Sequence, residues 1–174
     1  MRSGGLCITL TPSSIDEVFG ADISRADLVE VRLDYLKQPE EAATARWDGL
    51  KLPVIATCRG KERGGLFEGS LEEEIRILGS AAQNGAQFVD IDYRHSRPFG
   101  NASVIASYHN FNETPQNLES IIQQAHASGA AIAKVATQVN SWSDNCALMK
   151  LLPVKRSKPV IVAGMGDIGQ ITRL

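Results

Sequence analysis

A lysine and a histidine stand in two neighbouring apolar segments of the chain. Lys134 lies in the apolar run 130–136, which contains no acidic residue. Desolvation in such a run disfavours the ammonium form and lowers the lysine pKa, which frees the amine to attack a carbonyl group. His109 ends the run 104–109, and an imidazole that titrates near neutral pH suits a general base or acid.

The spacing of Lys134 and His109 is more informative than either residue alone. They are 25 residues apart, the length of a loop, a helix and a strand, so a parallel sheet would place them at the same end of adjacent strands. For Lys134 alone, the alternative is a strand-end lysine whose amine snorkels to water. For His109 alone, it is a structural histidine hydrogen-bonded at a strand end.

Charged residues at two earlier strand positions could contact a polar substrate. Glu30 and Arg32 are two residues apart on one predicted strand and therefore share a face. A buried ion pair contributes little to stability, which favours substrate contact, although a solvated strand face is the alternative. Arg59 closes the run 54–58 and could bind a hydroxyl or carboxylate with its planar guanidinium, and Gly64 and Gly65 follow in a loop.

Composition excludes several classes of protein. The chain has 174 residues, with 18 basic and 20 acidic side chains, so a nucleic acid or an anionic membrane surface is not expected as its partner. No apolar run approaches the roughly 18 residues of a membrane helix, and no secretory signal is evident. The three cysteines lack metal-site spacing, and there is no HExxH motif, Walker loop or nucleophile elbow. A cytoplasmic enzyme acting on a small molecule, without a metal, is expected.

Short apolar runs alternate with helical patterns from end to end. They are typical of parallel strands buried on both faces and predict a single α/β domain over residues 1–174. The runs are 6–10, 28–33, 53–58, 86–91, 103–108, 130–135 and 159–163.

Helix-start signals lie between these runs. Ser70 and Glu73 form a capping-box pattern, and Thr114 and Pro115 predict a helix with proline at its first position. Two further helices are predicted from residue 13 onward and over residues 39–47.

Seven strands fit either a doubly wound open sheet or a (β/α)8 barrel. Nearly every predicted strand ends in a polar or otherwise functional side chain, as expected where the strands of a barrel share one site. The sequence therefore predicts a (β/α)8 TIM barrel. The chain is short compared with about 250 residues for a typical barrel, so the barrel is expected to lack its last strand–helix unit after Leu174.

A set of motifs in this order resembles the type I 3-dehydroquinate dehydratases over essentially the whole chain. The matching segments are Glu30-Val31-Arg32-Leu33-Asp34, Ala56-Thr57-Cys58-Arg59 with Gly64-Gly65, Val89-Asp90-Ile91-Asp92, Ser107-Tyr108-His109-Asn110-Phe111 with Thr114-Pro115, Ala133-Lys134-Val135-Ala136, and Met165-Gly166 leading to Thr172-Arg173.

The resemblance implies dehydration of 3-dehydroquinate to 3-dehydroshikimate in the shikimate pathway, without metal or organic cofactor. Lys134 would be the Schiff-base lysine and His109 the general base and acid. The implied substrate contacts are Glu30, Arg32, Arg59, Met165 and Arg173, the last holding the carboxylate. A homodimer is a candidate assembly.

Two departures from the family pattern stand out. The family usually has a glutamate directly before the Gly-Gly pair, thought to orient the histidine, whereas this chain has Arg63 there and Glu62 one residue earlier. Either Glu62 takes over that role, or the orientation and charge state of the histidine differ. The family also continues with a Ser-bearing loop and a Pro-Gly-Gln segment, so a chain ending at Leu174 is expected to turn over poorly unless these parts are supplied elsewhere. Another Schiff-base lyase of aldolase type, or an impaired barrel with an interaction role, are the alternatives.

Overall fold

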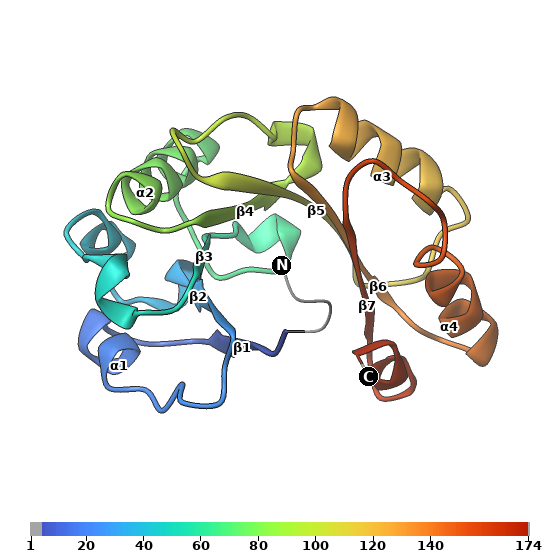
Figure 1. Ribbon diagram of the computed structural model, residues 1–174, viewed down its shortest axis with the longest axis horizontal. Helices are drawn as coiled ribbons and strands as arrows, with labels where there is room; N and C mark the ends of the chain where they lie inside the picture. The colour runs from blue at the N-terminus through green and yellow to red at the C-terminus, as the bar shows by residue number, and fades with distance from the viewer. Residues whose placement is uncertain (1–4, 174) are drawn as a thin grey trace. The chain divides into compact units, whose positions relative to one another are not determined.

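The computed structural model describes residues 5–173, which form two compact units. Residues 5–90 with 98–103 make up the first unit, and residues 91–97 with 104–173 make up the second. In each unit, parallel strands run beside helices that are consecutive with them in the chain (Figure 1).

The first unit contains strands that pair in parallel in chain order. They are β1 (Cys7–Leu10), β2 (Leu28–Arg32), β3 (Val54–Thr57) and β4 (Phe88–Asp92), of which β4 belongs to this unit as far as Asp90. The helices are α1 (Ile15–Phe19) and α2 (Leu71–Gln83), with 3-10 segments η1 (Leu33–Tyr35), η2 (Pro39–Ala43), η3 (Trp47–Leu50) and η4 (Lys61–Arg63).

The register of these strands separates a polar face from an apolar one. Rung partners in a parallel sheet point to the same side, and side chains alternate along a strand. One face therefore carries Glu30 and Arg32 of β2 together with Thr57 of β3, and the other carries Val29 and Val31. Both valines are fully buried, whereas Glu30 and Arg32 are half-buried.

The second unit is organised in the same way. Its strands β5 (Ser103–Asn110, in this unit from Val104), β6 (Ile132–Gln138) and β7 (Val160–Met165) pair in parallel in chain order. Its helices are α3 (Leu118–Ala127) and α4 (Trp142–Met149), with η5 (Tyr93–His95) and η6 (Ile168–Arg173). The buried face of α3, with Ile121 and Ile122, packs toward β6.

The predicted strands and most of the predicted helices are confirmed. Each of the seven apolar runs overlaps one strand, and α2 begins directly after Ser70 with the expected capping box to Glu73. The predicted start of α3 at Thr114 and Pro115 is wrong, because the Thr114 hydroxyl donates to the Gln138 carbonyl at 2.8 Å and does not cap a helix. The helix begins at Leu118 instead.

Two other segments differ from the sequence prediction. The predicted helix over residues 39–47 consists of the 3-10 turn η2 and the start of η3, with no regular α-helix between them. Helix α4 was not predicted, although Ser141 and Asp144 form a capping box at its start. An aspartate in place of the usual glutamate or glutamine makes that signal harder to recognise.

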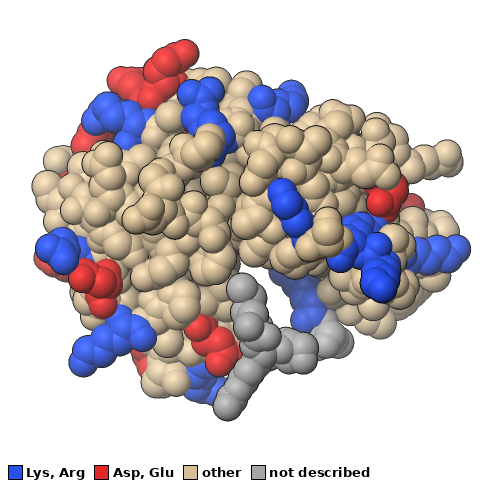
Figure 2. Space-filling model, turned by 45° about the horizontal axis from the view of Figure 1, so that its top comes forward, with Lys and Arg blue, Asp and Glu red and all other residues tan. Residues whose placement is uncertain are grey.

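Basic and acidic side chains lie interspersed on the face shown in Figure 2, in keeping with their near-equal numbers. Among the described residues, no helix is both long enough and apolar enough to cross a membrane.

Candidate active site

In the second unit, Lys134 and His109 lie on the same face of adjacent parallel strands, as their spacing predicts. Lys134 on β6 is the rung partner of Ser107 on β5, and His109 is two residues farther along β5. Given a strand separation of about 4.8 Å and a rise of about 3.3 Å per residue, their Cα atoms are about 8 Å apart. Both residues are half-buried, so each keeps some contact with solvent.

The strand positions around this pair restrict its surroundings. Ser107 is buried, and its hydroxyl donates to the carbonyl of Ile91 at 3.2 Å. The His109 ring stacks on Phe111, with ring centroids 6.1 Å apart and planes inclined by 16°. The imidazole therefore has an aromatic neighbour on one face.

The loop that follows β5 is hydrogen-bonded to the end of β6 and to the loop after it. The Thr114 hydroxyl lies 2.8 Å from both the Thr137 hydroxyl and the Gln138 carbonyl. Asn140 donates from its side chain to the Asn112 carbonyl at 2.8 Å. These bonds hold the loop that begins just after His109 against the end of β6.

Met165 and Arg173 lie at the carboxyl end of β7. Met165 is the rung partner of Gln138 and is half-buried on the Lys134 face. Arg173 is exposed and donates to the Gly164 carbonyl at 3.2 Å, while Thr172 accepts from the Gly164 amide at 2.7 Å. The segment η6 is therefore folded back onto the end of β7.

In the first unit, Glu30 is held by hydroxyl groups on both neighbouring strands. Thr57 donates to one carboxylate oxygen at 2.8 Å, and Thr9 donates to the other at 3.1 Å. Hydrogen bonds to both oxygens fix the orientation of the Glu30 carboxylate on the polar face of the sheet.

Arg32 pairs with Asp34, two residues farther along. Its Nε and a terminal nitrogen donate to the two Asp34 oxygens at 2.9 and 2.7 Å, and the guanidinium lies 4.9 Å from the centre of the Tyr35 ring. Burial acts to lower the pKa of Arg32, but the hydrogen bonds to Asp34 and the negative charge of that carboxylate outweigh it and raise the Arg32 pKa. The guanidinium therefore stays charged. The sequence analysis placed Arg32 beside Glu30 and did not identify Asp34 as its partner. A carboxylate two residues away could have suggested it, because Arg and Asp side chains within reach of each other form bidentate pairs.

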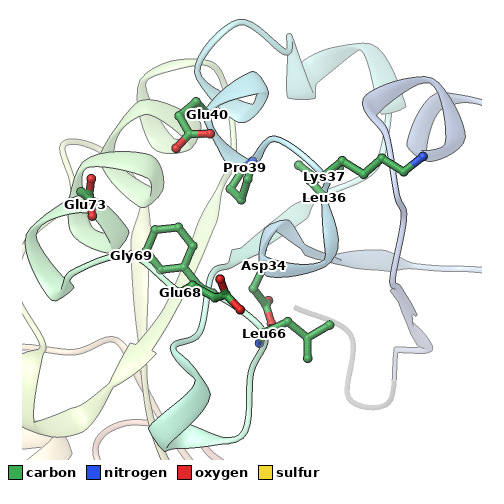
Figure 3. Close-up of a pocket in the computed structure, with 10 residues that line it drawn as sticks. Asp34, Leu36, Lys37, Pro39, Glu40, Leu66, Glu68, Gly69 and Glu73 are labelled. Carbon is green, nitrogen blue, oxygen red and sulfur yellow. The ribbon is translucent and has the colours of Figure 1, made fainter.

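Asp34 also lines a pocket of about 300 Å³ in the first unit. It accepts the amide N–H of Leu66 at 3.0 Å, and Figure 3 shows Glu40 and Glu73 on the other side of the pocket from Asp34 and Leu66. The Asp34 carboxylate thus connects Arg32 to the loop that follows β3.

Arg59 belongs to this same loop and pairs with Asp90. A terminal nitrogen of Arg59 donates to an Asp90 oxygen at 3.0 Å, and both side chains are largely buried. Asp90 is the rung partner of Thr57, so it lies on the polar face that also carries Glu30.

The loop residues before the Gly-Gly pair have different environments. The Glu62 side chain is 70% exposed and accepts from Arg63 Nε at 2.8 Å. The Arg63 side chain is only 10% exposed and donates to both oxygens of Glu74 on α2, at 3.0 and 2.5 Å. Burial acts to lower the Arg63 pKa, but the bonds to Glu74 and Glu62 raise it overall. Glu74 was not identified from the sequence, because it lies within a predicted helix, far from the strand ends.

The structure also bears on whether the chain could hold a metal ion. Among residues 5–173, no three His, Cys, Asp or Glu side chains are grouped so that they could hold a metal ion. The thiol of Cys58 is buried, which raises its pKa, and the carboxylates of Asp34 and Glu74 act in the same direction.

Comparison with known families identifies the chain. A family model described as type I 3-dehydroquinase matches residues 6–174. The chain belongs to this family. The membership confirms the resemblance and the enzyme class expected from the sequence motifs.

Several 3-dehydroquinate dehydratases are similar in sequence. That of Desulfotalea psychrophila is 30% identical over 190 residues, covering 100% of this chain and 83% of the relative. That of Methanothermobacter thermautotrophicus is 37% identical over 158 residues, covering 86% of this chain and 70% of the relative.

Solved dehydroquinase structures share the fold. The 3-dehydroquinate dehydratase from Geobacillus kaustophilus aligns with a TM-score of 0.86 at 25% identity, covering 99% of this chain and 78% of that one. The type I enzyme from Clostridium difficile, solved with covalently modified comenic acid, aligns with a TM-score of 0.82 at 20% identity, covering 98% and 78%. The predicted fold class is thereby confirmed: the chain has the α/β barrel fold of the type I dehydroquinases, with seven strands among its described residues.

Proposed function

We propose that this chain dehydrates 3-dehydroquinate through an imine formed at Lys134. The observation that carries the proposal is the shared face of Lys134 and His109 on adjacent parallel strands, in a chain of the type I 3-dehydroquinase family. An amine and an acid–base group in reach of one small molecule are the two groups that this reaction requires.

The reaction runs in four steps. The Lys134 amine attacks the ketone of the substrate, and loss of water gives a cationic imine that withdraws electrons from the adjacent carbon. His109 removes a proton from that carbon and then donates a proton to the departing hydroxyl group, which leaves as water. Hydrolysis of the imine releases 3-dehydroshikimate and regenerates the Lys134 amine.

The remaining side chains that the family resemblance implies are also proposed to contact the substrate. Glu30, Arg32 and Arg59 offer one carboxylate and two guanidinium groups for its hydroxyls, and Arg173 offers a guanidinium for its carboxylate. Met165 is a proposed apolar contact. Glu62 remains the proposed substitute for the glutamate that the family places before Gly-Gly. A cytoplasmic location and a homodimer stay predictions.

Borohydride reduction in the presence of 3-dehydroquinate tests the proposal. The expected result is a covalent adduct in the intact mass that peptide mapping assigns to Lys134. Lys134→Ala should abolish the adduct, whereas Lys150→Ala, a matched control at an exposed position, should retain it. No adduct from the folded wild-type chain would contradict the imine.

His109 is tested by separating imine formation from turnover. His109→Ala should still give the adduct but lose about 10²–10⁴-fold in formation of the enone product, measured by its absorbance. Unchanged turnover would remove His109 from the mechanism, and an adduct without any enone from the wild-type chain would favour the aldolase alternative.

A further inference from the structure

The loop that carries Arg59 is closed on itself by backbone hydrogen bonds. The amide of Phe67 donates to the Arg59 carbonyl at 3.0 Å, and the amide of Lys61 donates to the Phe67 carbonyl at 3.2 Å. At Gly65 a Cβ atom would lie 1.9 Å from the Arg59 carbonyl oxygen, so the returning part of the loop packs directly on the Arg59 backbone. The placement of Arg59 therefore depends on the conformation of the whole segment 59–67.

Glu74 holds this loop from helix α2. Its side chain is 1% exposed and accepts from two guanidinium nitrogens of Arg63, at 3.0 and 2.5 Å. Gly60 is the centre of the loop, since its carbonyl accepts the amides of Arg63 and Gly65 at 3.0 and 3.1 Å. One buried carboxylate thus holds the loop through the side chain of Arg63, whose own amide bonds to the Gly60 carbonyl next to Arg59.

The position of Glu74 is itself well determined. Ser70 and Glu73 form the capping box that fixes the start of α2, and the amide of Glu74 donates to the Ser70 carbonyl at 3.0 Å. Because α2 also packs against β3, the helix and the strand that leads into Arg59 form one rigid support.

We propose that Glu74 is a positioning residue for Arg59. Through Arg63 it holds segment 59–67 so that the Arg59 guanidinium stays on the polar face of the sheet, beside Asp90. This inference rests on the proposed function, in which Arg59 contacts the substrate. Glu74 touches no substrate and acts only through the loop.

Glu74→Gln tests this role, because the amide keeps the size of the side chain but loses its charge. The matched control is Glu72→Gln, which is exposed on the same turn of α2. Steady-state kinetics with 3-dehydroquinate should show KM raised about tenfold with kcat nearly unchanged, the effect of weakening one charge-assisted hydrogen bond to the bound substrate. In an Arg59→Ala background, Glu74→Gln should raise KM no further, whereas multiplied effects of the two substitutions would overturn the proposal.

A second variant covers the case in which Glu74→Gln fails to fold because Arg63 loses its buried counter-charge. Arg63→Gln combined with Glu74→Gln leaves no buried charge unpaired and should show the same rise in KM. A wild-type KM in this double variant would overturn the proposal.

Hydrogen–deuterium exchange decides the proposal without relying on turnover. Peptides that span residues 59–67 should exchange faster in Glu74→Gln than in Glu72→Gln or wild type. If the wild-type chain does not dehydrate 3-dehydroquinate, the proposed function fails, but faster exchange still supports the hold of Glu74 on the loop. Unchanged exchange in segment 59–67 overturns the positioning role whatever the activity.

Discussion

Replacing Asp34 by asparagine tests the energetic weight of a buried ion pair that sequence analysis did not identify. The substitution keeps the shape of the side chain but removes its charge. The Asp34 side chain is 0% exposed and that of Arg32 is 14% exposed, so the guanidinium would be left largely buried without its counter-charge. The new amide would also place N–H groups where only acceptors fit.

The expected loss follows from this burial. Removing one partner of a buried pair costs about 3–5 kcal/mol in the free energy of unfolding. Because Arg32 keeps some contact with water, we expect the lower end, about 3 kcal/mol. For a chain of this size, that corresponds to a melting temperature lower by about 6–12 °C.

The chain provides a matched control for Asp34→Asn. Arg46 and Asp48 form a pair with the same sequence spacing, but their side chains are 75% and 57% exposed. Asp48→Asn should leave the melting temperature nearly unchanged, because exposed pairs are screened by water. Thermal unfolding followed by circular dichroism at neutral pH measures both variants, and equal shifts would refute the argument from burial.

Two further predictions concern the first unit and the cysteines. Gly65→Ala should lower the melting temperature and raise KM, because the new Cβ would overlap a loop carbonyl oxygen. In the control Gly79→Ala, in α2, the new Cβ meets no atom within 4 Å, so this substitution should stabilise the chain by about 0.5–1 kcal/mol. Melting shifts in the opposite directions would contradict this reasoning. At about pH 8, the thiol of Cys58 should resist alkylation until the chain unfolds, since burial raises its pKa and keeps it protonated, while the exposed Cys7 and Cys146 should react at once. Mass spectrometry of the native chain after a short alkylation checks this, and rapid labelling of Cys58 would count against it.

Much of the fold could be predicted because the strand segments are short runs of apolar residues, which indicate burial directly. The apolar runs around Val31, Ala56 and Val135 have the length and composition of buried parallel strands, and each coincides with one. Helix α2 was predictable because its capping box is local in sequence. The start of α3 was not, since the hydroxyl of Thr114 binds across to the end of β6, a contact that no local pattern contains.

The candidate site divides in the same way. The common face of His109 and Lys134 follows from residue types, strand period and the parallel arrangement, all of which the sequence carries. The partners of the charged residues do not follow, because they depend on loop geometry. Arg32 turns to Asp34, and Arg63 reaches a helix residue eleven positions away.

The Arg63–Glu74 pair has a consequence for how this family diverges. A glutamate at position 63, as the family usually has, would face Glu74 across a buried gap, and neither carboxylate would have a cation to neutralise it. A neutral residue at position 74 would in turn leave the largely buried Arg63 with only the exposed Glu62 as its partner. A change at position 63 or position 74 alone would therefore destabilise the chain, so the residues at these two positions are expected to covary. Relatives with glutamate before Gly-Gly should lack an acidic residue at position 74.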